Sequence, residues 1–158
     1  MKRWMKRLVL SLVATLAIAG CNGKENEKAV ASKPQPVKPP SVVVVPENVR
    51  GKWKAVKIEV ADKNAKGQKV YTIGIGSAFQ LPDSNLTITV ENFLPHFVME
   101  GTTLTSQSNE LKNPAAQLRI SENGRDIYKG WLFTLYPTTH AFQHPQYSFT
   151  LVGYVPAD

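Results

Sequence analysis

The stretch that decides the fold covers residues 115–134 and reads AAQLRISENGRDIYKGWLFT. At its centre stands Asn123-Gly124, a dipeptide that suits the two positive φ angles of a type I′ turn, whose twist matches a pair of antiparallel strands. The stretch therefore predicts a tight β-hairpin. Its second strand is apolar on both faces around Trp131. We therefore expect that strand to be central in a sandwich or to line a closed barrel.

Other segments on both sides of this hairpin alternate apolar and polar residues, which is typical of half-buried strands. They cover residues 56–60, 70–75, 86–90 and 147–155, with residues 42–45 as a short candidate that Pro46 ends. In the last strand we expect Tyr147, Phe149 and Leu151 to share one face. We find no convincing amphipathic helix after Cys21. The sequence predicts an all-β fold, a single small β-sandwich or partly closed barrel of about six to eight mostly antiparallel strands.

The first 20 residues have the three-part pattern of a secretory signal peptide. Residues 1–20 have a basic start, an apolar run from Leu8 to Ala19 and an exit of small residues. The apolar run is shorter than the about 20 residues that a transmembrane helix needs. We therefore interpret residues 1–20 as a signal peptide, which places the rest of the chain outside the cytoplasm.

The end of that signal, Ile18, Ala19, Gly20 and Cys21, resembles the bacterial lipobox. The resemblance implies that Cys21 is lipidated and becomes the new N-terminus of a lipoprotein. Each buried methylene of an acyl chain contributes ~0.8 kcal/mol, so several chains on one residue hold a soluble domain at a membrane. By the same resemblance, Asn22 favours sorting to the outer membrane, with the domain facing the periplasm. The alternative is an uncleaved anchor with an incidental cysteine.

Residues 21–47 are rich in lysine and proline and contain few large apolar side chains before Ser41. Such a composition cannot offset the entropy of folding and favours a disordered tether, extended in part as polyproline II. A short recognition sequence for a partner is the alternative. We predict three parts: a signal peptide over residues 1–20, a tether over residues 21–47 and a β-rich domain over residues 48–158.

The net charge of +7 invites a nucleic-acid interpretation, but the charge is unevenly placed. Four of the 19 basic residues precede Cys21, and residues 47–158 hold nearly as many acidic as basic residues. A nearly neutral domain lacks the basic surface that would neutralise several phosphates. We therefore expect no nucleic-acid partner.

A second resemblance concerns the C-terminal part. Its residues are Gly130, Trp131, Leu132, Phe133, Pro137, His144, Pro145 and Tyr147. This pattern resembles small secreted bacterial proteins known as a domain of unknown function, family 2155, over about residues 50–155. Members often carry one cysteine at the end of a strand like residues 86–93 and another near the C-terminus. Phe93 and Tyr154 occupy those places here, so the resemblance implies an aromatic contact between them. The family has no established activity.

Three histidines form the basis of a metal-site hypothesis. His140 and His144 are four residues apart and His96 lies elsewhere, and three convergent imidazoles bind zinc or copper. Met99 would add a soft ligand for cuprous copper. Ordinary hydrogen-bonded or exposed histidines are the alternative, and our leading interpretation expects no cofactor.

Aromatic residues are frequent near the C-terminus, and three of them are candidate binding residues: Trp131, Tyr136 and Phe142. Rings on loops present flat faces to a glycan or a protein, whereas rings on strands are usually core. The partners that we consider are an envelope protein, peptidoglycan and, through the lipid, the membrane.

The residues show neither a serine in a nucleophile elbow nor two carboxylates that face a cleft. Our leading hypothesis is therefore a lipid-anchored envelope protein that acts as a non-enzymatic binding or assembly module. The first alternative is a periplasmic metal-binding protein that uses the histidines. The second is an envelope hydrolase whose site leaves no local motif.

Overall fold

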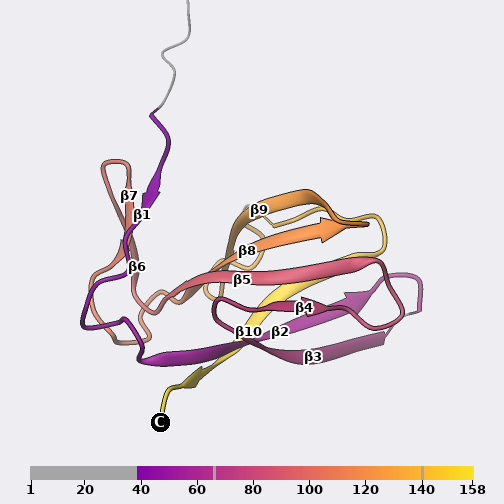
Figure 1. Ribbon diagram of the computed structural model, residues 1–158, viewed down its shortest axis with the longest axis horizontal. Coiled ribbons are helices and arrows are strands. Elements are labelled where there is room, and N and C mark those ends of the chain that lie inside the picture. Colours follow the sequence, from indigo (N-terminus) through magenta and orange to yellow (C-terminus); the bar gives the residue numbers. More distant parts are fainter. Residues whose placement is uncertain (1–38, 66, 140) are drawn as a thin grey trace, which may run out of the picture. The chain divides into compact units, whose positions relative to one another are not determined.

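Ten strands and no helix are formed by residues 39–65, 67–139 and 141–158, which the computed structural model describes (Figure 1). These residues accordingly include no helix that could cross a membrane. The signal peptide, Cys21, residues 22–38 of the tether and His140 lie outside the described residues. The strands are β1 (Val42–Val43), β2 (Trp53–Asp62), β3 (Gly67–Gly74), β4 (Ala78–Gln80), β5 (Leu86–Leu94), β6 (Phe97–Glu100), β7 (Thr103–Ser106), β8 (Ala115–Glu122), β9 (Arg125–Phe133) and β10 (Tyr147–Pro156).

Two antiparallel sheets form a sandwich. One has the strand order β4-β5-β8-β9 and the other the order β10-β2-β3. Alternate residues of both sheets point into the space between them and are buried there, which is the physical result of the period-two pattern in the sequence. The largest of these side chains come from five strands: Ile58, Ile88, Leu118, Ile120 and Leu151.

A third, small sheet has the order β1-β7-β6 and stands at one end of the sandwich (Figure 1), where Phe97 of β6 packs against Trp131 and Phe133 of β9. Strand β1 pairs with β7 in parallel, and β6 and β7 form a hairpin whose turn contains Gly101 at φ +61°. Leu94 and Ala115 alternate with core residues and so point outward, yet both are 0% exposed. They are buried because the small sheet adds a third layer over this part of the outer face.

The predicted hairpin is confirmed. Strands β8 and β9 are antiparallel neighbours, and Asn123 and Gly124 in the turn have φ angles of +51° and +78°. The predicted position of its second strand is wrong, because β9 is an edge strand and its Ile127 is 39% exposed. The strand that is buried on both faces is β8. Apolar residues on the outer face of β9 have a different explanation, since the small sheet packs on them.

The all-β class is confirmed, and the architecture is a β-sandwich because none of the three sheets among the described residues closes on itself. The described residues form ten strands, more than the six to eight that the pattern indicates, since β4, β6 and β7 are short and their alternation is weak. Strand β1 pairs with β7 although it lies within residues 21–47, the range predicted to be a tether. The strands expected over residues 56–60, 70–75, 86–90 and 147–155 are present as β2, β3, β5 and β10.

The predicted contact between Phe93 and Tyr154 is also confirmed. Their rings are stacked with centroids 5.2 Å apart, and Trp53 packs edge-on against both. The hydroxyl of Tyr154 lies 2.9 Å from Oγ1 of Thr134 and donates a hydrogen bond to it. This aromatic cluster closes the sandwich at the end where the small sheet lies.

The stacked pair predicts an energetic coupling between Phe93 and Tyr154. In a double-mutant cycle of Phe93→Ala and Tyr154→Ala, we expect a coupling free energy of about 0.5–1.5 kcal/mol, measured by urea denaturation. Phe93→Ala combined with Tyr136→Ala is the control, because Tyr136 is 57% exposed. Additivity in the first cycle would show that the ring contact contributes nothing of its own.

Candidate functional site

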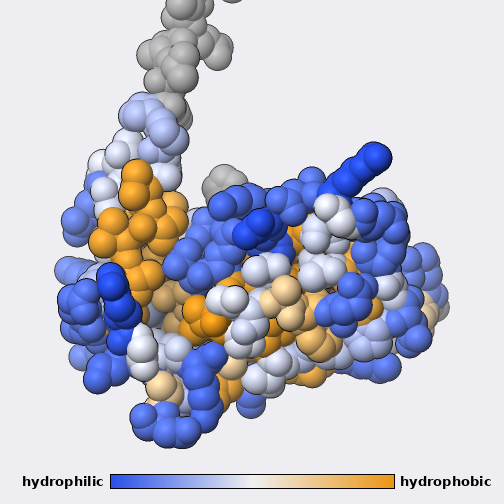
Figure 2. Space-filling view, in the orientation of Figure 1, coloured by the Kyte–Doolittle hydropathy of each residue, from blue (hydrophilic) through white to orange (hydrophobic). Residues whose placement is uncertain are grey.

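A crevice separates the small sheet from the outer face of β8 and β9. Its apolar half has a volume of about 660 Å³. The small sheet lines it with Phe97, Met99 and Leu104, and β9 lines it with Trp131 and Phe133. Figure 2 shows hydrophobic side chains gathered over the small sheet, beside hydrophilic side chains over the ends of β8 and β9.

Strand geometry places these side chains together. Phe97 and Met99 are two residues apart on β6 and therefore share a face, and Leu104 joins that face because it pairs with Met99 across the hairpin. Trp131 and Phe133 share the outer face of β9 by the same rule. The ring of Phe97 packs edge-on against both, with centroids 5.1 Å and 5.0 Å away. These contacts hold the aromatic wall of the crevice in place before any ligand binds.

A second, polar pocket shares the lining residue Lys129 with the apolar one, and we refer to the two pockets together as the crevice, with a polar and an apolar half. Glu91 lies at a bulge of β5 and forms salt bridges with Arg119 at 2.8 Å and Lys129 at 3.0 Å. In the lining of the same half, Nδ2 of Asn92 donates a hydrogen bond of 2.7 Å to Oε1 of the buried Gln117. A ligand that spans both halves would meet aromatic rings, then amides, then charges.

The three predicted binding residues have different environments. Trp131 lies in the crevice. Tyr136 is exposed on the loop after β9. Phe142 is partly buried, with its ring 4.7 Å from that of Tyr128 and 5.9 Å from that of Phe149, so it packs at the margin of the core. The ring of Phe142 therefore packs as part of the protein interior, like the rings on strands, although Phe142 lies on a loop.

The metal hypothesis requires three convergent histidines, and the two that the structure describes, His96 and His144, do not converge. His96 follows the C-terminal end of β5, whereas His144 lies near Glu122, which pairs with the first residue of β5. Strand β5 has nine residues, so eight residue-to-residue steps separate these ends, a distance of about 26 Å. His140 lies outside the described residues, and within them no group of three His, Cys, Asp or Glu side chains could hold a metal ion.

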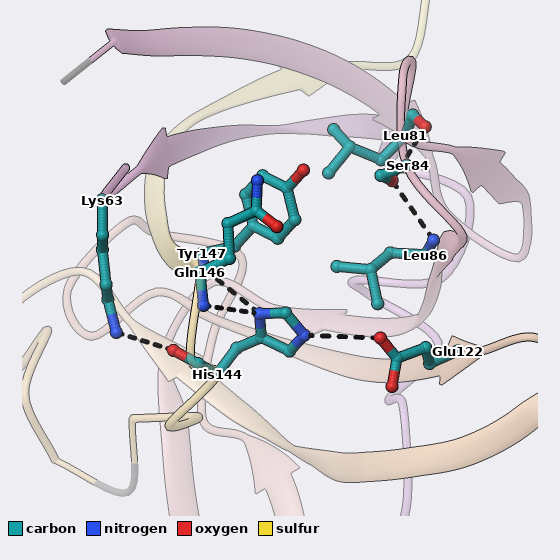
Figure 3. Close-up of polar contacts among 8 residues, drawn as sticks. All are labelled: Lys63, Leu81, Ser84, Leu86, Glu122, His144, Gln146 and Tyr147. Carbon is teal, nitrogen blue, oxygen red and sulfur yellow. Dashed lines mark hydrogen bonds and ion pairs between the residues drawn. The ribbon is translucent and has the colours of Figure 1, made fainter. Parts of the chain in front are cut away.

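His144 has a structural role that Figure 3 shows. Its Nδ1 accepts hydrogen bonds from the backbone N–H groups of Gln146 at 3.2 Å and Tyr147 at 3.1 Å, so this nitrogen carries no proton. The proton is therefore on Nε2, which lies 3.8 Å from a carboxylate oxygen of Glu122. The side chain is only 10% exposed. The imidazole thus satisfies two N–H groups at the start of β10.

A polar pocket beside His144 bears on the hydrolase alternative, since Asp83, Ser84 and Glu122 also line it. The hydroxyl of Ser84 donates to the carbonyl of Leu81 at 3.0 Å and accepts from the N–H of Leu86 at 3.2 Å. Among the described residues, no hydrogen bond joins Ser84 to His144. This hydroxyl therefore stabilises a turn.

Asp62, at the same end of the sandwich, also stabilises a turn. Backbone N–H groups of Ala65 and Asn64, followed by the side-chain amide of Gln146, donate to its carboxylate and lower the pKa of Asp62 below its usual value. Because hydrogen bonds to the charged form lower a pKa, the stability that this carboxylate adds is present at neutral pH and is lost in strong acid.

The residues that the sequence did not single out are those of the small sheet, above all Phe97 and Leu104. The pattern over residues 93–105 is ambiguous because Pro95 argues against a central strand there. The available signal was the short apolar run from Phe97 to Met99 close before Gly101, which fits a short hairpin strand.

Comparison of the chain with models of protein families, with curated proteins and with solved structures found no match. The resemblances to the lipobox and to the domain of unknown function 2155 therefore stay predictions. The candidate site is argued from its geometry alone.

The role of His144 generates a stability prediction. We expect His144→Ala to lower the free energy of unfolding by about 1–3 kcal/mol, since it leaves N–H groups at the start of β10 without their acceptor. Thermal or urea denaturation measures this loss. Gln143→Ala, at an exposed position on the same loop, is the control and should change stability little. Equal effects of the two substitutions would contradict the assigned role.

Proposed function

We propose that this protein is a lipid-anchored, non-enzymatic binding module of the bacterial cell envelope, and that the crevice is its binding site. The observation that carries the proposal is the apolar half of the crevice, which is open to solvent and walled by aromatic side chains. Met99 at its rim is 63% exposed. Exposed apolar side chains that cluster around a concave surface mark interaction sites, because covering them with a ligand removes apolar area from water.

The aromatic wall has the properties of a binding hot spot. Trp131 and Phe133 are held by Phe97, so little side-chain entropy is lost when a ligand packs on them. Large aromatic residues in a preformed, partly desolvated pocket dominate the affinity of many interfaces. The salt bridges of Glu91 lie at the polar side and provide the rim that such an interface requires.

The composition of the crevice favours a protein ligand over a glycan. Sugars stack on the open face of an aromatic ring, but the ring of Trp131 has Phe97 packed against it. Methionine, leucine and phenylalanine fit apolar side chains of a polypeptide, and methionine adapts its shape to them. We therefore propose an envelope protein, rather than peptidoglycan, as the partner.

The anchor and the tether are part of the proposal. About 20 residues separate Cys21 from β1, and a stretched segment of this composition reaches ~60 Å. Such a tether would let the crevice meet partners at some distance from the outer membrane. No specific observation among the described residues favours the metal-binding or the hydrolase alternative.

The anchor is tested by Cys21→Ser. We expect this variant to move from the membrane fraction to the soluble periplasmic fraction while its circular dichroism spectrum stays β-rich, because the buried apolar side chains of the described domain all lie between Val49 and Leu151. Fractionation of cells followed by immunoblotting measures the location. A variant that stays with the membrane would argue against a lipid anchor, and loss of the β-rich spectrum would show that Cys21 is structural.

The binding site is tested by photo-crosslinking in cells. A photo-reactive residue at Thr139, which is exposed and lines the apolar half, is expected to give a discrete protein adduct. The same residue at Val70, which is exposed on β3, is the matched control and should give none. Trp131→Ala should reduce the Thr139 adduct by about 30-fold, the effect of losing a hot spot of about 2 kcal/mol.

Two results would contradict the proposed site. One is an adduct of equal yield from Val70, which would indicate non-specific contact. The other is an adduct from Thr139 that Trp131→Ala leaves unchanged. Denaturation of purified Trp131→Ala checks that a lost adduct does not come from a lost fold.

A further inference from the structure

We infer that the ligand of the crevice is an extended segment of a partner protein, which adds as a strand to the open edge of β6. This inference rests on the proposed function, because it names the chemical class of ligand for the same site. It is carried by the backbone of β6, which is independent of the aromatic wall.

The outer edge of β6 is open at one residue, Met99. At Phe97, the backbone N–H donates to the carbonyl of Asn113 at 3.0 Å, and the carbonyl accepts from Nδ2 of Asn113 at 3.0 Å. Both groups of Phe97 therefore point away from β7. Because backbone groups in an antiparallel strand alternate in direction, both groups of Met99 point away from β7 as well.

The partner strand gives the same result. Leu104 lies opposite Met99, and its carbonyl accepts a hydrogen bond of 2.9 Å from the N–H of Val44 on the other side. Met99 and Leu104 are therefore a pair without mutual hydrogen bonds. Within the described part of the chain, no hydrogen bond to the N–H or the carbonyl of Met99 is formed. One donor and one acceptor are thus available at the rim of the crevice.

An unpaired N–H and C=O on a strand edge match one kind of ligand best, which is another extended peptide. Such a strand would present every second side chain to the apolar half, where Met99, Leu104 and Trp131 would receive them. Next to this half, Arg119 and Lys129 share the carboxylate of Glu91, with Asp126 at 3.8 Å from Arg119. These two cations and two carboxylates balance in charge, so the polar half favours neither sign of ligand, and the apolar half favours a segment with alternating apolar residues.

Segments of this chain itself fit less well. Residues 22–38 carry four lysines, two glutamates and two prolines, without alternating apolar residues, so they do not complement the apolar half. The strand that follows them in the sequence, β1, lies on the edge of the small sheet opposite β6. A second copy could pair through its own β6 and is treated as an outcome of the experiment.

The experiment uses the full chain in cells with the photo-reactive residue at Thr139 and compares Met99→Pro with Met99→Leu. Proline removes the N–H of residue 99 and is tolerated on an outer edge, since this N–H makes no bond to β7. Leucine keeps the N–H and an apolar side chain. We expect Met99→Leu to keep the adduct and Met99→Pro to reduce it at least about fivefold, the effect of one lost hydrogen bond.

The outcomes distinguish failure of the strand-addition inference from failure of the proposed function. If both Met99 variants keep the adduct while Trp131→Ala loses it, the site binds through side chains alone, and strand addition is overturned although the proposed function stands. If Trp131→Ala also keeps the adduct, both fail. Mass spectrometry of the adduct should find a segment of another protein with alternating apolar residues. An adduct with a second copy, a lipid or a glycan would overturn the inference.

A second measurement avoids dependence on the folding of Met99→Pro. In the complex of the unsubstituted chain with its captured partner, hydrogen exchange of the Met99 amide should be slowed relative to the free protein, because strand addition gives this N–H an acceptor. An exchange rate that does not change in the complex would overturn the inference even if the proline variant fails to fold.

Discussion

The burial of β8 on both faces is the constraint on which the rest of the structure depends. Its inner side chains, among them Ala116 and Leu118, are part of the sandwich core, and its outer side chains Ala115 and Gln117 are also buried. A strand with two buried faces needs a layer on each side. The second sheet supplies one layer. The small sheet supplies the other, and because it has only three short strands, it covers one end of the outer face and leaves a crevice at its margin.

Across the outer face of the four-stranded sheet, successive rows of side chains along the crevice change from apolar to charged. The row under the small sheet consists of Leu94, Ala115 and Phe133, which are apolar, and the next consists of Asn92, Gln117 and Trp131. The third row contains Arg119 and Lys129, and both bond to Glu91. Each row lies about two residues farther along the strands, so the change from apolar to charged takes place over a short distance. A ligand therefore needs an apolar part and a polar part close together, which is a property of short peptide segments.

The two ends of the sandwich differ in how their polar groups are used. At the end with His144 and Asp62, the side chains accept hydrogen bonds from nearby backbone N–H groups and hold turns and the start of β10. At the end with the small sheet, the backbone of Met99 makes no hydrogen bond among the described residues, and apolar side chains are exposed. Polar groups that already form hydrogen bonds inside the protein are not available to bind a ligand. The end with the small sheet is therefore the better candidate for binding.

The sequence by itself determined the features that depend on neighbours along the chain. Asn123-Gly124 predicted its turn because positive φ angles are a local preference, and the alternation in β2, β5 and β10 predicted strands because successive side chains of a strand point to opposite faces. The contact of Phe93 with Tyr154 followed from a resemblance rather than from these rules.

Only the tertiary structure decided which layer covers each strand. An apolar pattern indicates that a side chain avoids water but does not indicate which element covers it. For this reason the sequence predicted a central position for β9, whereas in the structure β8 is central and β9 is at the edge. For the same reason the sequence could suggest that His96 and His144 converge, whereas the length of β5 separates them. It pointed to Trp131 but not to its contact with Phe97, because that contact joins two sheets whose packing no local rule describes.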